Sequence, residues 1–279
     1  MHNSLDLVMW VKDGTYTLSH VLDKLNRVFP SEIVNQKIVV DDDSKDLSQA
    51  IARQFGWKVI KNEGKGISDA ANTALKHVET KTFCSFEQDV LVSSDWYSKI
   101  PNVLGGKVVV ASGVRLPYPS KTLRDITQFE ITRAKCDLLD LYMPIHHVFG
   151  MSLDNTCYNT EFMNSIGGFP NVPKGAGVDR VLAEKVLKNG FEWSINYDVQ
   201  SNHIRKGVWD ELKHYYWYGR CQKQIDNSKI AYLGLVGRVL FSPLRGLDIA
   251  FHQKNWQCTL VYPAIRTASL VGALKGLTE

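Results

Sequence analysis

The sequence predicts an α/β protein of the Rossmann type, with a mostly parallel β-sheet flanked by helices and a helical C-terminal appendage. Two observations support this prediction. Over the first 110 residues, short β-type runs alternate with amphipathic helical patterns, which is typical of a parallel sheet covered by helices. Polar residues follow several of these runs, and ligands of such sheets bind beyond the carboxyl ends of the strands.

The first part of the chain contains five strand-like runs and three helical patterns. We expect strands at 5–11, 38–40, 57–60, 83–86 and 107–111. The first helix is indicated by apolar residues that share one helical face, namely Leu18, Val21, Leu22, Leu25 and Val28. We expect Ser44 to cap the second helix and Ser68 to cap the third, because a serine hydroxyl can accept hydrogen bonds from the amides of the first turn. In the second helix Leu47 is expected to face inward.

The middle of the chain is less regular, and its composition changes after about residue 200. We expect helices at 122–141 and 179–188, and strands at 151–158 and 193–197. Beyond residue 200 the sequence becomes more basic, aromatic and apolar. We therefore predict one domain over residues 1–200, divided near residue 110, and a helical tail over residues 201–279.

The composition excludes several classes of protein. The chain has 279 residues and a formal net charge of +4, which is too weak a positive charge to indicate a nucleic-acid partner. Its five cysteines are scattered and form no C-x-x-C pair, so we expect reduced thiols of the cytoplasm rather than disulfides or a cysteine-built zinc site. The first ten residues lack the pattern of a signal peptide, and no uninterrupted apolar run reaches eighteen residues.

Acidic residues cluster behind three of the predicted strands. Asp13 follows the first strand, Asp41–Asp43 follow the second, and Glu87–Asp89 follow the fourth. Carboxylates that converge on one crevice repel one another unless a cation compensates them, and a divalent metal held by carboxylates often engages substrate phosphates. For Asp41–Asp43 alone, a solvated turn beside a helix cap is the simpler explanation. The combination of the three clusters favours a binding site.

Five segments resemble the motifs of family 2 glycosyltransferases with the GT-A fold. Residues 38–46 (IVVDDDSKD) look like the family's VVDDGSTD segment, and residues 62–75 (NEGKGISDAANTAL) are similar to its N-x-G-x-S-x-A-x-N segment. Residues 86–89 (FEQD) stand in place of its D-x-D motif, and residues 165–169 (SIGGF) match its GGF loop. Val178 and Asp179 stand where the family has a Glu-Asp pair, so that Asp179 matches the Asp. The order and spacing agree across roughly residues 5–200.

The resemblance implies a nucleotide-diphosphate sugar donor, bound mainly by residues 1–110. It places Asp13 and Asp42 near the base and ribose, with Asp41 as the alternative to Asp42. It also implies that Asp89 binds Mg²⁺ or Mn²⁺ bridging the two phosphates, a cation that stabilises the charge of the departing nucleoside diphosphate. The other residues expected on the donor side are Val11, Lys12, Lys65, Gly66, Asn72, Glu87 and Gln88.

The resemblance also implies the acceptor side, formed by residues 111–200. Asp179 is expected to be the general base that accepts the proton of the acceptor hydroxyl, and a single base with direct displacement implies inversion at the anomeric carbon. Gly167, Gly168 and Phe169 are expected beside the sugar and acceptor. The chain departs from the family pattern at Glu87, which stands where the first Asp of D-x-D is usual, and at Val178, which replaces the usual Glu.

Two residues after the last predicted strand are further candidates. A neutral imidazole at His203 suits Mn²⁺ as a third ligand, and the Arg205 guanidinium suits bidentate contacts to a diphosphate. A surface histidine and a solvated arginine remain open as alternatives.

The tail beyond residue 200 carries eleven Lys and Arg against five Asp and Glu, together with the most apolar segments of the chain. Apolar helices with sparse basic residues fit an anchor on an anionic membrane surface, with Arg238 and Arg245 seven residues apart on one helical face. We accordingly expect a peripheral protein at the cytoplasmic face of the cell membrane that acts in glycan biosynthesis on a lipid-linked acceptor, a polyprenyl phosphate or a lipid-linked glycan. Packing against the catalytic domain or a homo-oligomer partner is the alternative.

Two other functions compete with a transferase. A phospho-receiver domain also gathers acidic residues at strand ends, but it is smaller, has no GGF loop and needs a single isolated Asp after its third strand. A non-catalytic nucleotide-sugar or glycan-binding module on the same fold stays open as the alternative.

Overall fold

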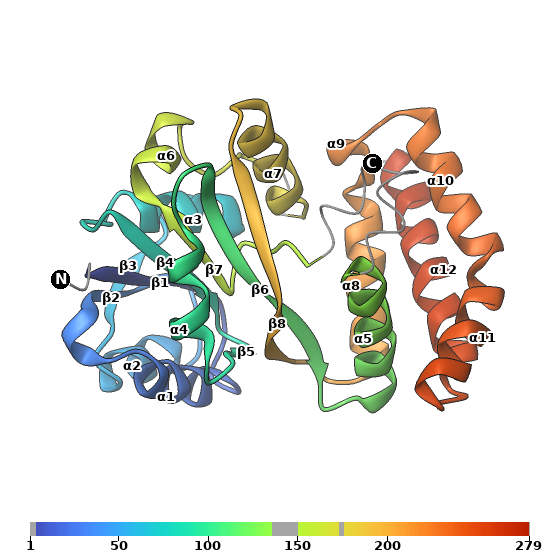
Figure 1. Cartoon of the computed structure of the whole chain (residues 1–279), viewed down its shortest axis with the longest axis horizontal. Helices are drawn as coiled ribbons and strands as arrows, with labels where there is room; N and C mark the ends of the chain where they lie inside the picture. Colours follow the sequence, from blue (N-terminus) through green and yellow to red (C-terminus); the bar gives the residue numbers. More distant parts are fainter. Residues whose placement is uncertain (1–3, 136–149, 173–175, 279) are drawn as a thin grey trace. The chain divides into compact units, whose positions relative to one another are not determined.

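The computed structural model describes residues 4–135, 150–172 and 176–278. By their internal contacts the residues fall into two compact units (Figure 1). Unit 1 comprises residues 1–115, 150–171 and 178–203, and unit 2 comprises residues 116–149, 172–177 and 204–279. The chain therefore passes between the units several times, and the predicted division into residues 1–200 and 201–279 stays a prediction.

An eight-stranded sheet, ordered β3-β2-β1-β4-β7-β6-β8-β5, is the centre of unit 1. Strands β3, β2, β1 and β4 are parallel to one another, whereas β7 is antiparallel to both β4 and β6, and β5 is antiparallel to β8. The bounds are β1 Leu5–Val11, β2 Val34–Asp41, β3 Lys58–Lys61, β4 Thr82–Glu87, β5 Val90–Leu91, β6 Val108–Tyr118, β7 Thr156–Asn159 and β8 Glu192–Ile204.

Helices cover both faces of this sheet: α1, α2 and α4 lie on one face and α3, α6 and α7 on the other (Figure 1). Every residue of β1 is buried, as expected for a central strand with helices on both sides. The inward face predicted for the first helix is confirmed, because Leu18, Val21, Leu22 and Leu25 of α1 are buried. The bounds are α1 Leu18–Val28, α2 Ser48–Gln54, α3 Gly66–Leu75, α4 Trp96–Lys99, α6 Thr160–Ser165 and α7 Val178–Lys188, with 3₁₀ turns at Ser31–Ile33 and Pro101–Val103. The predicted α/β fold is confirmed.

The two serine caps predicted from the sequence are wrong. Helix α2 begins only at Ser48. The Ser48 amide, at the start of the first turn, donates a hydrogen bond to the Asp46 carboxylate at 2.9 Å and not to Ser44. As a result Leu47 precedes the helix and is 65% exposed instead of facing inward. Helix α3 begins at Gly66, which places Ser68 inside it. There the Asp69 carboxylate reaches back to the Lys65 amide at 2.8 Å.

Two further predictions differ from the structure in their bounds. The strand predicted at 151–158 is a strand only over β7, and the preceding residues form a buried loop in which Asn155 has a φ of +58°. The helix predicted at 122–141 is α5, Lys121–Lys135, and the rest of that range lies outside the described residues.

Unit 2 is helical, as predicted for the C-terminal appendage. It contains α5 together with α8 Val208–Arg220, α9 Gln222–Ile225, α10 Lys229–Leu240, α11 Ser242–Gln253 and α12 Cys258–Leu277. Its apolar core joins α5, α11 and α12 through Leu123, Ile126, Phe129, Ile249, Ala250, Cys258, Tyr262 and Ile265. Helices α8 and α12 approach closely at two glycines: a Cβ added at Gly219 would overlap the Ser269 carbonyl, and one at Gly272 would overlap the Tyr216 carbonyl.

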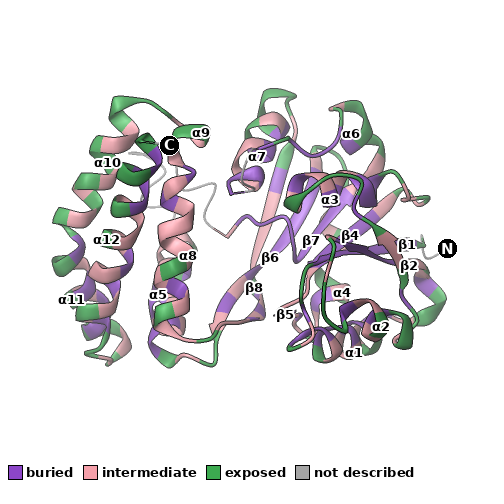
Figure 2. Ribbon diagram, turned by 180° about the vertical axis from the view of Figure 1, so that it is seen from behind, coloured by how far each residue is buried: buried purple, intermediate pink, exposed green. Residues whose placement is uncertain are grey.

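Exposed residues recur along the outer helices α10 and α11 (Figure 2). Among the described residues, no single helix meets the length and hydropathy of a bilayer-spanning segment. Only α10 and α11 taken together do so, and they are bent by 53° where they meet.

Candidate functional site

The loops that follow β1 and β2 lie side by side at the carboxyl edge of the sheet. Val11 pairs with Asp41 in the parallel register, and the Asp42 amide donates to the Val11 carbonyl at 2.8 Å. The Lys12 ammonium lies 3.2 Å from the Asp42 carboxylate. The Asp13 amide donates to the Ser44 hydroxyl, and the Asp13 carboxylate accepts the amide of Lys45. Residues from two of the three predicted acidic clusters thus meet.

Asp41 and Asp42 have different surroundings. Asp41 is buried, and its carboxylate accepts the Ser44 amide at 3.1 Å and the Gln49 side chain at 2.8 Å, so it holds the turn from within. The Asp42 side chain is 13% exposed and accepts hydrogen bonds from Asn62 at 2.7 Å and from the Gly66 amide at 3.3 Å. Burial raises the pKa of Asp42, but the hydrogen bonds from Asn62, Lys12 and Gly66 outweigh it and hold the pKa below its usual value. Asp42 is therefore a stable carboxylate at the edge of the loop.

Asn72 joins α3 to the GGF loop through both ends of its side-chain amide. Its Oδ1 accepts the Phe169 amide at 2.8 Å, and its Nδ2 donates to the Phe169 carbonyl at 2.9 Å. Gly167 and Gly168 have φ values of +78° and +80°, and a Cβ at Gly168 would overlap the Asn72 oxygen. The Phe169 ring is buried, with edge-to-face contacts to Trp10, Phe83 and Tyr158. The loop is thus fixed from its inner side.

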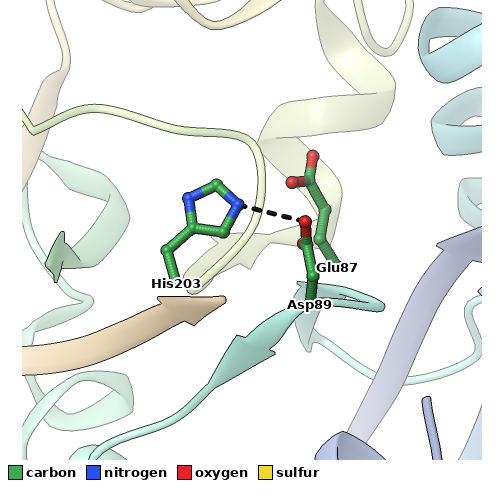
Figure 3. A group of neighbouring side chains, drawn as sticks. All are labelled: Glu87, Asp89 and His203. Atoms are coloured by element: carbon green, nitrogen blue, oxygen red, sulfur yellow. Dashed lines mark hydrogen bonds and ion pairs between the residues drawn. The ribbon is translucent and has the colours of Figure 1, made fainter. Parts of the chain in front are cut away.

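Glu87, Asp89 and His203 gather beyond the end of β4 (Figure 3). Glu87 is the last residue of β4, Asp89 lies in the turn before β5, and His203 is brought to them because it pairs with Val90 of β5. His203 Nε2 lies 3.2 Å from an Asp89 carboxylate oxygen, and one ligand atom from each of the three residues lies within 4.8 Å of the others. His203 is only 6% exposed, so it is not the surface histidine of the alternative explanation, and its role as a metal ligand stays a prediction.

The side chain of Gln88, which lies between Glu87 and Asp89 in the sequence, contacts the backbone of Lys12. Its side chain accepts the Lys12 amide at 2.8 Å and donates to the Lys12 carbonyl at 2.9 Å, which ties the turn after β4 to the loop after β1. Lys65, also expected on the donor side, is exposed and precedes α3, where Gly66 has a φ of +76° and open space at its Cβ position.

Two residues of the site were missed by the sequence prediction. The Arg115 guanidinium lies 2.8 Å from Asp154 and 3.6 Å from Glu87, and the Trp10 indole donates to Glu87 at 3.3 Å. The Asp154 side chain is only 1% exposed. A signal was available, since Asp154 and Asn155 lie side by side in the middle of the segment 151–158 that was predicted as a strand.

Charges of the same sign are concentrated here. Burial, with the neighbouring carboxylate of Asp154 next in importance, raises the pKa of Glu87 to about 8, although Arg115 opposes the rise. Burial likewise raises the pKa of Asp179, while the Arg180 amide and Arg115 oppose it and Asp154 adds to it. Because Arg115 and Asp154 act on both acids, Glu87 and Asp179 share one electrostatic environment. We call Glu87, Asp89, Asp154 and Asp179 the acidic cluster.

Asp179 enters this cluster from the first turn of α7. Its carboxylate accepts the amide of Arg180 at 2.8 Å, and the positive end of the helix dipole favours a negative charge at this position. The second carboxylate oxygen is not held by that bond. This leaves an oxygen that can accept a proton from a bound molecule.

Arg205 belongs to unit 2, whereas His203 belongs to unit 1. The Arg205 guanidinium lies 3.3 Å from the Glu211 carboxylate and 3.2 Å from the His214 ring. Its backbone amide donates to the Tyr118 carbonyl at 2.7 Å. His203 and Arg205, the two candidates predicted after the last strand, therefore lie in different hydrogen-bond networks.

Solved structures of other proteins share the fold of this chain. A mannosyltransferase from Pyrobaculum calidifontis, solved in complex with GDP-Man and Mn²⁺, aligns with a TM-score of 0.65 and 14% identity over 99% of this chain and 88% of its own. Glucosyl-3-phosphoglycerate synthase from Mycobacterium tuberculosis, in complex with Mn²⁺, UDP and glucosyl-3-phosphoglycerate, aligns with a TM-score of 0.58 and 17% identity over 80% of this chain and 77% of its own. The same synthase with Mg²⁺ and UDP aligns with a TM-score of 0.56 and 17% identity, covering 80% of this chain and 76% of its own.

A comparison with curated proteins finds no match. A comparison with protein families gives a more specific result than the fold. Residues 17–161, just over half of the chain, match the family described as glycosyl transferase family 2. This range contains Asp41 and Asp42, the acidic motif after β4 and the Arg115–Asp154 pair. The prediction of a glycosyltransferase is confirmed, and the chain belongs to glycosyl transferase family 2.

Proposed function

We propose that the protein transfers a sugar from a nucleotide-diphosphate donor to a hydroxyl or phosphate acceptor with the help of a divalent metal ion. The observation that carries the proposal is the gathering of Glu87, Asp89 and His203 within 4.8 Å, next to a second set of donor-side residues at the ends of β1 and β2. Structures with the same fold hold GDP-Man with Mn²⁺, or UDP with Mn²⁺ or Mg²⁺, and support the choice of ligands.

The residues at the end of β4 suit Mn²⁺ or Mg²⁺. Two carboxylates and a neutral imidazole are ligands that Mn²⁺ accepts, and Mg²⁺ prefers the carboxylates. Burial and the neighbouring carboxylate of Asp154 raise the pKa of Glu87 to about 8, and a cation bound here would favour the ionised form of Glu87. When bound, the ion would neutralise the charge that develops on the leaving nucleoside diphosphate.

The donor-side residues fit the nucleoside part of the donor. Asp42 is held ionised by Asn62, Lys12 and Gly66, so it can accept hydrogen bonds from ribose hydroxyls. The Asp41 carboxylate is buried and its Oδ2 is used within its own turn, whereas Asp42 is partly exposed, which favours Asp42 over Asp41 for this role. Lys12 and Asp13 flank Asp42 and complete this side of the site.

Asp179 is the residue that we propose as general base. Its raised pKa makes its ionised form a stronger base than an ordinary carboxylate. It accepts the proton of an acceptor hydroxyl as the oxygen attacks the anomeric carbon, and this direct displacement inverts the configuration. A phosphate acceptor would be ionised already and would need the base less.

For the acceptor we propose a lipid-linked molecule, a polyprenyl phosphate or a lipid-linked glycan, at the cytoplasmic face of the cell membrane. The support is the exposed apolar side chains of α10 and α11 in unit 2.

Donor binding is tested by thermal unfolding of the full chain with UDP-, GDP- and dTDP-sugars, with and without Mn²⁺. A donor that binds only the folded state raises the melting temperature by mass action, and we expect one nucleotide to do so in the presence of Mn²⁺. Asp89→Asn should abolish the metal-dependent part of the shift. Asp43→Asn is the matched control, because Asp43 is an exposed acid whose partner is Lys45. If no nucleotide stabilises the wild-type protein, or if both variants behave alike, the donor site is refuted.

Catalysis is tested with Asp179→Asn. The variant should lose turnover by about 10²–10⁴-fold, the usual contribution of a general base, while it keeps the donor-induced shift in melting temperature. If the wild-type protein binds the donor but transfers the sugar to no acceptor and does not hydrolyse the donor either, the protein is a binding module instead.

A further inference from the structure

The outer helices of unit 2 expose large apolar side chains to solvent. The apolar face is formed by Ile230, Leu233, Leu240, Phe241, Leu244 and Phe251, which are between 64% and 81% exposed. It extends from α10 through the α10–α11 junction into α11. Trp256 continues it beyond α11, since its ring lies edge-to-face on Phe251 at 5.2 Å.

This exposure is far beyond that of isolated surface leucines. Single exposed apolar residues are normal, but contiguous apolar patches on soluble proteins mark sites where something binds. Helix α10 contains no buried residue at all, although eight of its twelve residues are apolar or aromatic. A helix that is apolar around its circumference is stable only when it is covered by protein or lipid.

The charges around the apolar face favour an anionic lipid surface. Residues 229–260 contain four Lys and Arg but a single acid, Asp248. Lys229 is the first residue of α10, and Lys254 follows the last residue of α11, so cations stand at both ends of the helix pair. Long basic side chains at the ends of apolar helices reach lipid phosphates while their stems stay in the apolar layer. A second copy of the chain would bring cations of the same sign to this face.

Arg245 does not take part in this face, contrary to the sequence prediction that placed it with Arg238 on one basic side. Its guanidinium lies 3.2 Å from Glu130 of α5 and 3.3 Å from Asp248, and it stacks over the Phe129 ring. It therefore fixes α11 to α5 and neutralises the one acid of the segment. The exposed side of α11 is left apolar.

The geometry of the helix pair indicates a position in the membrane surface. A twelve-residue helix is about 18 Å long, too short for a hydrocarbon core of about 30 Å. The bend of 53° between α10 and α11 and the attachment of α11 to α5 and α12 suit two helices lying along an interface.

We propose that the apolar face of α10 and α11 binds the surface of an anionic lipid bilayer, with its side chains at the boundary between headgroups and acyl chains. The inference rests on unit 2 alone and does not depend on sugar transfer by unit 1.

The test is co-sedimentation of the full chain with liposomes of phosphatidylcholine and phosphatidylglycerol (3:1) and of phosphatidylcholine alone. We expect binding to the anionic liposomes that weakens with salt and is at least tenfold weaker on neutral ones. The double variant Phe241→Ser/Leu244→Ser should lower the affinity about tenfold or more. The control is Leu47→Ser/Leu187→Ser, which removes two exposed leucines of unit 1 and should bind like the wild type.

The outcomes separate the alternatives. Equal binding by both double variants, or no binding to anionic liposomes, overturns the proposal. A dimer in light scattering that the Phe241→Ser/Leu244→Ser variant loses, without lipid binding by the wild type, assigns the face to a second copy instead. Metal-dependent stabilisation by the donor nucleotide, measured on the same variants, shows whether unit 1 functions independently of the lipid result.

Discussion

The surroundings of Asp179 disfavour the ionised form of its carboxyl group. Burial raises its pKa above the usual value of 3.8, so the protonated form persists to higher pH than for a free aspartate. A general base must be deprotonated, and we therefore expect kcat/KM to fall as the pH is lowered through this raised pKa. The pH–rate profile of the wild type measures it, and an acid limb with its midpoint at or below 3.8 would exclude Asp179 as the titrating base.

The same shift has a consequence for stability. Since the folded-state pKa of Asp179 is above its unfolded value, the folded protein is stabilised by protonation, and this contribution is lost as the pH rises through the folded pKa. At neutral pH Asp179→Asn should thus leave the free energy of unfolding unchanged or increase it while turnover is lost. A large loss of stability would mean that the inactivity comes from unfolding.

At the scale of single residues, the sequence predicts which side chains could bind ligands but not how they contact one another. Asp42, Asp89 and His203 were predicted as ligand-binding residues and now lie in sites of suitable composition. Asp41 and Asp42 are adjacent and chemically identical, so only the fold could show that one is used within its turn. Arg115 and Asp154 are 39 residues apart in sequence, and no local pattern reveals their contact.

The GGF loop is an element whose shape depends on Asn72. Gly168→Ala places a methyl group onto the Asn72 oxygen and forces a non-glycine residue into a φ of +80°. Gly167→Ala is the matched control, because its φ of +78° imposes the same backbone strain while its Cβ meets nothing within 4 Å. We expect about 1–2 kcal/mol of destabilisation for the control and about 1–3 kcal/mol more for Gly168→Ala. Chemical denaturation measures both, and equal losses would show that the Asn72 brace is unimportant.

The contact between α8 and α12 depends on glycines in the same way. An alanine at Gly272 would overlap the Tyr216 carbonyl, and because backbone cannot move aside cheaply we expect a loss of about 3 kcal/mol. Gly234→Ala in α10 has open space and removes a flexible residue from a helix, so it should stabilise by up to about 1 kcal/mol. Thermal unfolding of the two variants checks the opposite signs. A neutral Gly272→Ala would contradict the close packing of these helices.

At the scale of elements, periodic patterns were reliable and their ends were not. The apolar spacing of Leu18 to Leu25 predicted α1 because helical periodicity acts over several turns. The predicted starts of α2 and α3 were wrong because the amides at these helix starts donate hydrogen bonds to Asp46 and Asp69 and not to Ser44 and Ser68. Several polar residues near a helix start can act as the cap, and the choice depends on the approach of the preceding loop.

At the scale of the whole molecule, the residues of the proposed chemistry and the apolar face lie in different units. Unit 1 holds the acidic cluster, the donor-side loops and Asp179, which are the residues that the proposed chemistry needs. Unit 2 holds the apolar face. The sequence predicted the helical tail but did not show that α5, from the middle of the chain, belongs with it, because that pairing arises from contacts such as Arg245 with Glu130 across more than a hundred residues.

We propose that Asp89 and His203 bind a divalent cation that joins the protein to a donor diphosphate. The decisive measurement is a crystal of the full chain grown with Mn²⁺ and either UDP or GDP, with diffraction recorded at the manganese absorption edge. We expect an anomalous peak within about 2.0–2.4 Å of an Asp89 oxygen and the His203 imidazole nitrogen, shared with phosphate oxygens of the nucleotide. A nucleotide bound with manganese elsewhere, or with Asp89 and His203 still paired to each other alone, would contradict it.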